Sequence, residues 1–259
     1  MFELLTITGF LVIFIATSLG AALVFLFKKD ISEKLNSIFI GVAAGIMLAA
    51  SIWSLLLPSI DGAQEVYGAY SFIPAVIGFI AGGFFIVILD KLVPNLGIDN
   101  KGGLKDELIK PVKMFIAITV HNIPEGLAVG FAFGGAAIIG TDTAYLSALG
   151  LAVGIAIQNF PEGAAVSLPL KRAMNSSGKS FLLGVLSGAV EPVAAIIGYF
   201  LASILSKSQP WFLAFAAGAM IFVVAEDLIP DAKTDKSHLG TWGVMSGFAV
   251  MMLLDVALG

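Results

Sequence analysis

Long apolar runs alternate with short polar segments along the whole chain. Each run ends at charged residues, at Gly or Pro, or at polar clusters, and covers about the 20 residues that a helix needs to cross the hydrocarbon core of a membrane. The pattern predicts eight spans, near residues 5–27, 36–57, 72–90, 112–137, 145–169, 181–206, 210–229 and 240–257. We therefore expect an all-α, polytopic membrane protein in which residues 1–259 form a single transmembrane domain.

Composition agrees with this pattern. Apolar residues make up 58% of the chain and charged residues 12%, and the mean hydropathy is +1.00, which is far from the balance of soluble proteins. The first run has no basic residue ahead of it and is followed by Lys28 and Lys29, so we interpret it as a retained span rather than a signal peptide. The chain has no cysteine, which excludes a disulfide framework and thiolate metal ligands.

The basic residues predict the orientation of the chain. Of the 14 Lys and Arg residues, all but Lys207 fall in or beside the segments that join spans 1 to 2, 3 to 4, 5 to 6 and 7 to 8. Under the positive-inside rule these segments are cytoplasmic, so we expect both termini to be extracytoplasmic and the protein to lie in the cell (inner) membrane. The outer segments carry Glu3, Asp61, Glu65 and Asp142, which favours cations over anions on that side.

The chain also resembles itself in segments that run in opposite directions through the membrane. HNIPEG at 121–126 in the fourth span matches QNFPEG at 158–163 in the fifth, and AAGIM at 43–47 in the second matches AAGAM at 216–220 in the seventh. Matched spans are an odd number of crossings apart, which is the pattern of an inverted repeat. Transporters built in this way hold their substrate near the midplane, at the interface of the repeats.

Polar side chains gather near the centres of three consecutive spans. In a helix, residues four apart share a face, so the histidine and glutamate of the first hexapeptide point the same way, and the glutamine and glutamate of the second repeat the arrangement. Because a short segment joins the fourth and fifth spans, we expect their centres to meet at one depth, where the sixth span adds a further glutamate. The candidate site residues are His121, Asn122, Glu125, Gln158, Asn159, Glu162 and Glu191.

Carboxylates at this depth need compensation. A charged side chain at the centre of a membrane helix costs roughly 2.5–3.5 kcal/mol, and no Lys or Arg lies near the three glutamates in these spans. The compensation is then protonation, water or a bound cation. An imidazole beside carboxylate and amide oxygens favours a borderline divalent metal such as Zn²⁺, Fe²⁺, Mn²⁺ or Co²⁺, with Cd²⁺ as a mimic.

Two other functions could use the same residues. An intramembrane enzyme would use histidine and glutamate to activate a metal-bound water, but the HExxH pattern is absent and His121 is the only histidine within a span, so we do not expect an enzyme. A proton-coupled carrier of a small organic anion would use the glutamates as proton relays, but the centres of the spans supply no Lys or Arg to contact an anion. A divalent-metal transporter is the leading hypothesis.

The paired hexapeptides, followed by Glu191-Pro192 in the sixth span, resemble the signature of the ZIP (Zrt/Irt-like) family of divalent-metal transporters, in particular its bacterial and archaeal GufA-like branch. The resemblance covers the whole chain. It implies a 3+2+3 helix arrangement, uptake of Zn²⁺ or another divalent metal into the cytoplasm by an elevator-like motion, and a homodimer. We expect divalent metal ions and the lipid bilayer as partners, with no organic cofactor and no nucleic acid.

The family motif also implies a binuclear metal site. It assigns a first metal position to His121, Glu125, Gln158 and Glu162, and a second to Asn122, Glu125, Asn159, Glu162 and Glu191, with both motif glutamates bridging. Some relatives carry Asp where this chain has Asn159, so the second position here has one charge fewer. Many family members have a His-rich loop between the third and fourth spans, whereas residues 91–111 contain no histidine, so we do not expect metal sensing by this loop.

Overall fold

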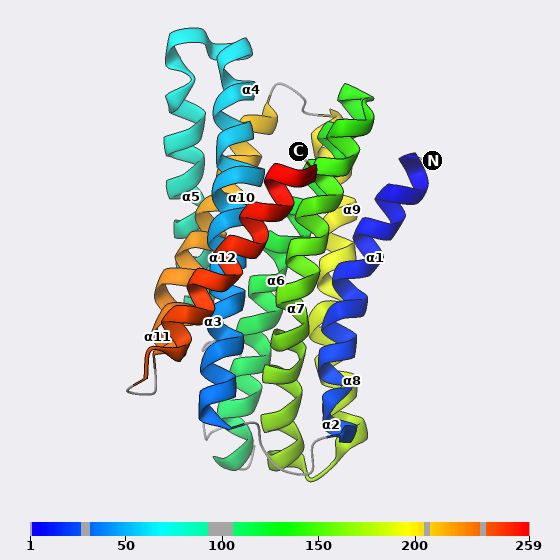
Figure 1. The fold of residues 1–259 in the computed structure, drawn as a ribbon, viewed down its shortest axis with the longest axis vertical. Coiled ribbons are helices and arrows are strands. Elements are labelled where there is room, and N and C mark those ends of the chain that lie inside the picture. Colours follow the sequence, from blue (N-terminus) through cyan, green and yellow to red (C-terminus); the bar gives the residue numbers. More distant parts are fainter. Residues whose placement is uncertain (1, 27–31, 93–105, 205–207, 234–236, 259) are drawn as a thin grey trace.

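The computed structural model describes residues 2–26, 32–92, 106–204, 208–233 and 237–258. Within these ranges the chain forms helices and no strands, which confirms the predicted all-α class (Figure 1). Some side chains inside the helices, including that of His121, lie outside the description. The described helices run lengthwise through one elongated bundle, and α1 begins and α12 ends toward the same end of it (Figure 1).

Each predicted span coincides with helical structure. Seven stretches are long and apolar enough to cross a membrane, and the third predicted span falls on a shorter apolar stretch, Phe72–Ile88, of α5. The elements are α1 (Phe2–Ala21), α2 (Leu23–Leu26), α3 (Glu33–Ala50), η1 (Ser51–Leu56), α4 (Leu57–Tyr67), η2 (Gly68–Tyr70), α5 (Phe72–Leu92), α6 (Asp106–Ile139), α7 (Asp142–Met174), α8 (Ser177–Gly188), α9 (Val190–Ile204), α10 (Gln209–Val223), η6 (Val224–Leu228), α11 (Ile229–Ala232) and α12 (Leu239–Leu258).

The second span is longer than the apolar pattern predicts. The helix continues from α3 through η1 and α4 to Tyr67, whereas the sequence predicts its end at residue 57. Pro58 cannot donate a hydrogen bond to the carbonyl four residues before it, and the wider π-helical turn η1 directly precedes it. The arrangement recurs at Pro230, where the π-helical turn η6 precedes α11. The matching irregularities agree with the internal repeat predicted from the second and seventh spans.

The helices associate in four principal pairs that also follow the repeat. Helix α1 packs along α7, α6 along α9, α3 along α12, and α5 along α10. Exchanging the first three spans for the last three, and the fourth for the fifth, converts the first pair into the second and the third pair into the fourth. The packing therefore obeys the symmetry that the sequence predicts.

Glycines allow these pairs to approach closely. A methyl group at Gly126 of α6 would collide with the backbone carbonyl of Glu191 on α9, and one at Gly163 of α7 would collide with that of Thr17 on α1. Contact through small residues is the usual way in which membrane helices pack, because lipid provides no hydrophobic force between them. The two pairs α1–α7 and α6–α9 are thus held at backbone contact around the candidate site.

The pairs form two bundles. Helices α1, α6, α7, α8 and α9 pack among themselves, as do α3, α5, α10 and α12, and the two bundles meet where α7 contacts α3 and α12 and where α6 contacts α10 (Figure 1). A hydrogen bond of 2.6 Å from Ser54 to Asp255 joins η1 to α12 inside the second bundle. All seven candidate site residues lie on α6, α7 and α9, hence in the first bundle.

Candidate metal site

The candidate residues are buried in the middle of the first bundle. The side chains of Asn122, Glu125, Gln158, Asn159 and Glu191 are each 0% exposed, although all five are polar. Glu162 is half-buried. His121 lies one turn before Glu125 on α6, and its side chain is outside the described set. The prediction of buried polar groups at the centres of the spans is therefore confirmed for five of the seven side chains.

A break in the sixth span positions Glu191. Helix α8 ends at Gly188 and α9 begins at Val190, because Pro192 has no N–H to donate to the carbonyl of Gly188, four residues earlier. At this break the backbone carbonyl of Ser187 accepts a hydrogen bond of 3.0 Å from the Asn122 side chain. Asn122 of α6 thus bonds to the backbone directly beside this break.

Three neutral donors hold the Glu191 carboxylate. Its Oε1 accepts hydrogen bonds of 3.0 Å from Thr17 and 3.0 Å from Asn122, and its Oε2 accepts one of 2.7 Å from Asn159. Asn159 also donates to the carbonyl of Ile13 at 3.3 Å. The carboxylate therefore joins α1, α6, α7 and α9 in one buried network.

Other oxygens of the cluster are open, in the sense that they have no hydrogen-bond partner among the described residues. Among the residues that the structure describes, no hydrogen-bond partner lies near Asn122 Oδ1, Glu125 Oε1 and Oε2, or Gln158 Oε1, although all four atoms are buried. Each of these atoms is an acceptor, and burying an unpaired acceptor is costly. A cation that coordinates oxygen provides the partner that such acceptors lack, so these unpaired oxygens fit a divalent metal as substrate.

Carboxylates alone do not form this cluster. Among the described side chains, no three of His, Cys, Asp and Glu lie together in a way that could hold a metal ion. Among the described side chains, a coordination that includes Glu125 would therefore draw on amide oxygens as well. The structure brings Asn122, Asn159 and Glu191 into direct contact and attaches Gln158 to Asn159 through a hydrogen bond of 3.0 Å.

Thr17 is a site residue that the sequence pattern did not single out. It is 0% exposed, and its hydroxyl lies 3.0 Å from Glu191 Oε1 and 3.2 Å from the backbone carbonyl of Ile13, two acceptors that share its single O–H. One signal could have found it, because Thr17 and Ser18 are polar residues in the middle of an apolar first span. A hydroxyl in a helix also commonly bonds to its own backbone, so the signal alone would have been ambiguous.

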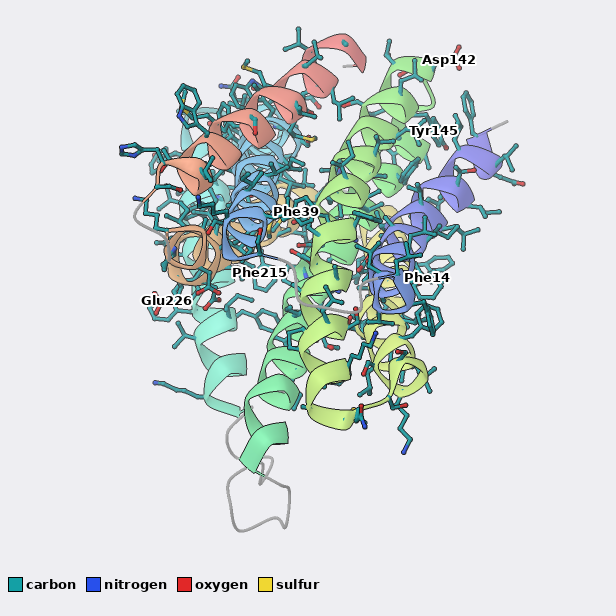
Figure 2. All side chains as sticks on the ribbon, turned by 60° about the horizontal axis from the view of Figure 1, so that its bottom comes forward. Phe14, Phe39, Asp142, Tyr145, Phe215 and Glu226 are labelled. Carbon is teal, nitrogen blue, oxygen red and sulfur yellow. The ribbon has the colours of Figure 1, made fainter. Side chains whose placement is uncertain are left out.

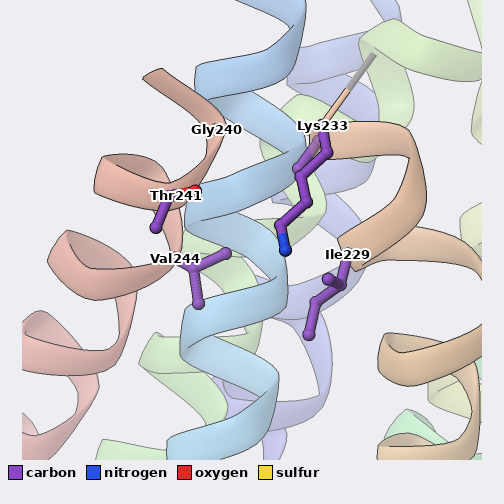
Figure 3. Close-up of a pocket in the computed structure, with 6 residues that line it drawn as sticks. Ile229, Lys233, Gly240, Thr241 and Val244 are labelled. Carbon is purple, nitrogen blue, oxygen red and sulfur yellow. The ribbon is translucent and has the colours of Figure 1, made fainter. Parts of the chain in front are cut away.

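Two other features of the molecule lie apart from the cluster residues. Near the start of α7, the ring of Tyr145 stacks on Phe2 of α1 with ring centroids 4.3 Å apart, which aligns these two helices from their first turns (Figure 2). A pocket of about 150 Å³ opens between α11 and α12, beside Lys233 and Thr241 (Figure 3). No candidate site residue lines this pocket, so it is separate from the cluster.

An inverted-repeat bundle of membrane-spanning helices, with a discontinuous helix and open polar groups at the repeat interface, defines the class of secondary transporters. Comparison with known proteins gives the family. A model of the family described as ZIP zinc transporter matches residues 112–255. The chain belongs to this family, which consists of transporters rather than enzymes.

Several relatives match nearly the whole chain. The chain is 37% identical to the zinc transporter ZIP11 of Xenopus tropicalis, with 94% of each protein covered. It is 34% identical to the zinc transporter GufA of Myxococcus xanthus, with 94% of this chain and 95% of the relative covered. It is 38% identical to the zinc transporter ZIPB of Bordetella bronchiseptica, with 95% and 79% covered. The predicted family and its GufA-like relatives are thereby confirmed.

Proposed function

We propose that this chain carries Zn²⁺, and other divalent metals such as Fe²⁺, Mn²⁺, Co²⁺ and Cd²⁺, across the cell membrane into the cytoplasm. The observation that carries the proposal is the set of open, buried oxygens on Asn122, Glu125 and Gln158. The family and the names of the relatives support zinc as the substrate. Residues 1–259 act as one transport domain.

In this proposal the metal binds at the midplane cluster. Glu125 contributes the charge, and the oxygens of Asn122 and Gln158 complete part of its coordination. Two further residues extend the ligand set along the same helices. Glu162 is on α7, one turn after Gln158, and His121 is on α6, one turn before Glu125. A second metal position, formed with Asn159 and Glu191, remains a prediction of the family motif.

The route and the movement are part of the same proposal. The distribution of Lys and Arg supports extracytoplasmic termini and inward transport, because outer acidic groups attract cations. The division into two bundles, with the cluster wholly in one of them, supports an elevator-like displacement of that bundle along the other. We propose a homodimer as the assembly.

Uptake into proteoliposomes tests the function. The full chain is reconstituted, and entry of Zn²⁺ and Cd²⁺ is compared between the wild type and Glu125→Gln, which keeps the shape of the side chain but removes its charge. We expect uptake by the wild type and a loss of at least tenfold in the variant, because one carboxylate supplies the charge among the open oxygens.

The matched control is Glu65→Gln, which removes an exposed carboxylate on α4 outside the cluster. It should retain most of the uptake. Equal uptake by the wild type and Glu125→Gln would show that metal crosses without this carboxylate, and the proposal would then fail.

A further inference from the structure

The Glu191 carboxylate differs from the other polar groups of the cluster. It accepts three hydrogen bonds, from Thr17, Asn122 and Asn159, and all four of these side chains are 0% exposed. Glu125, on the neighbouring helix, accepts no hydrogen bond from any residue within the described ranges. The protein thus supplies hydrogen-bond donors to Glu191, whereas the buried oxygens of Glu125 lack a donor among the described residues.

Backbone carbonyls fix the direction of both asparagine amides. The Asn122 nitrogen donates to Glu191 and to the Ser187 carbonyl, and the Asn159 nitrogen donates to Glu191 and to the Ile13 carbonyl. Turning either amide over would place its oxygen against two acceptors. Neither amide can therefore direct its oxygen toward Glu191.

The same network determines which oxygens remain available. The Asn159 oxygen is occupied because it accepts a hydrogen bond from the Gln158 nitrogen at 3.0 Å. This bond uses the nitrogen of the Gln158 amide and leaves its oxygen without a hydrogen-bond partner among the described residues. The Asn122 oxygen also stays open, since only its nitrogen is used. The available acceptors are therefore oxygens of Asn122, Glu125 and Gln158, whereas N–H and O–H donors surround Glu191.

We infer that Glu191, with Thr17, Asn122 and Asn159, forms a structural clasp rather than a second metal position, so that the cluster binds one divalent ion instead of two. The inference rests on the proposed function. A metal ion cannot occupy a site toward which N–H groups point, because a cation requires lone pairs. Glu191 and Thr17 are then positioning residues that hold α1, α6, α7 and α9 around a mononuclear site.

Residue 159 decides between the two states of the site. An asparagine can donate to Glu191 and keep the clasp closed, whereas an aspartate has no hydrogen to donate and would place a second carboxylate against the first. Two facing carboxylates repel each other, and either a shared proton or a cation between them relieves the repulsion. Asn159→Asp should therefore convert the clasp into a second metal position.

Counting bound metal tests the inference. The purified full chain is equilibrated with Zn²⁺ or Cd²⁺ by dialysis, and the ions per chain are measured by elemental analysis. We expect about one ion per wild-type chain and about two per Asn159→Asp chain. Zinc X-ray absorption of the wild type should show no second zinc at the separation of about 3.5–4 Å that is typical of two-metal sites.

The outcomes separate this inference from the proposed function. Two ions per wild-type chain, with a zinc neighbour in the absorption spectrum, would overturn the clasp and leave the metal transporter intact. One ion in a folded Asn159→Asp chain would also overturn it. If that variant does not fold, the wild-type count and spectrum decide alone. If the wild type binds no ion, the proposed function is refuted, and the inference of a mononuclear site is refuted together with it.

Discussion

At the scale of single residues, hydrogen bonds to a buried carboxylate hold the cluster together. Thr17 is the only donor from α1 to Glu191 among the described contacts, and it couples the first span to the break in the sixth. A hydrogen bond to a charged group contributes about 1.5–3 kcal/mol to stability. A change at this one hydroxyl should therefore be visible in the stability of the whole bundle.

Thr17→Val keeps the shape of the side chain and removes the donor. We expect the free energy of unfolding in detergent to fall by about 1.5–3 kcal/mol, because Glu191 loses one of its three partners inside the membrane domain. The matched control is Ser18→Ala, since the Ser18 hydroxyl donates only to its own helix, at the Phe14 carbonyl. Equal effects of the two changes in thermal or denaturant unfolding would contradict the special role of Thr17.

The types and depth of the site residues could be predicted from sequence, but their pairing could not. Helical spacing places Asn122 and Glu125 on α6 and Gln158 and Asn159 on α7, and the structure confirms that all four are buried. The direction of each amide depends on carbonyls of other helices, at Ile13 and Ser187. Spacing along one helix contains no information on those partners.

At the scale of the elements, close contact between helices keeps the site in register. A single added methyl at Gly126 would meet the backbone of Glu191 on α9. Backbone cannot move aside as a flexible side chain can, so the α6–α9 pair must separate. Separation would lengthen the hydrogen bond between Asn122 and Glu191, which crosses the same interface.

Gly126→Ala should therefore lower both stability and uptake. We expect a loss of about 1–3 kcal/mol from overpacking and a decrease in metal uptake by the folded fraction. Gly178→Ala in α8 is the matched control, because a methyl there meets no atom within 4 Å, and alanine favours a helix over glycine by about 1 kcal/mol. Unfolding and uptake measurements in which Gly126→Ala is as stable and as active as Gly178→Ala would contradict the close-contact account.

The existence of the helices was predictable, whereas their irregular ends were not. Apolar runs bounded by charged residues, Gly or Pro predict eight spans, and each of them coincides with helical structure. The same pattern places the end of the second span at residue 57, because Pro58 and the polar residues Asp61 and Glu65 are typical of a loop. The π-helical turn η1 accommodates the proline, and the helix continues to Tyr67. Such a turn depends on local backbone geometry that the apolar pattern does not encode.

At the scale of the whole molecule, the orientation of the chain decides the direction of transport. The α6–α7 turn and the α7–α8 turn lie at opposite ends of the bundle (Figure 1). The positive-inside rule assigns the first of them to the outside and the second to the cytoplasm.

Which helices pair could not be predicted from composition, because many of these helices offer similar glycine- and alanine-rich faces.

A chain without cysteine allows this orientation to be tested directly. Single cysteines are introduced at two exposed positions, as Asp142→Cys at the α6–α7 turn and Gly178→Cys after the α7–α8 turn. We expect a membrane-impermeant maleimide to label the first in intact cells and the second only after permeabilisation. Labelling in the reverse order would show that the chain has the opposite orientation in the membrane, and it would contradict inward transport.

The central claim is that the substrate metal binds at Glu125 in the middle of the membrane. Anomalous X-ray diffraction at the zinc edge, from crystals of the full chain grown with Zn²⁺, tests it most directly. The account predicts an anomalous peak about 2.0–2.2 Å from a Glu125 oxygen, as expected for zinc and carboxylate, beside the oxygens of Asn122 and Gln158. Zinc peaks elsewhere in the chain, with none at Glu125, would contradict it.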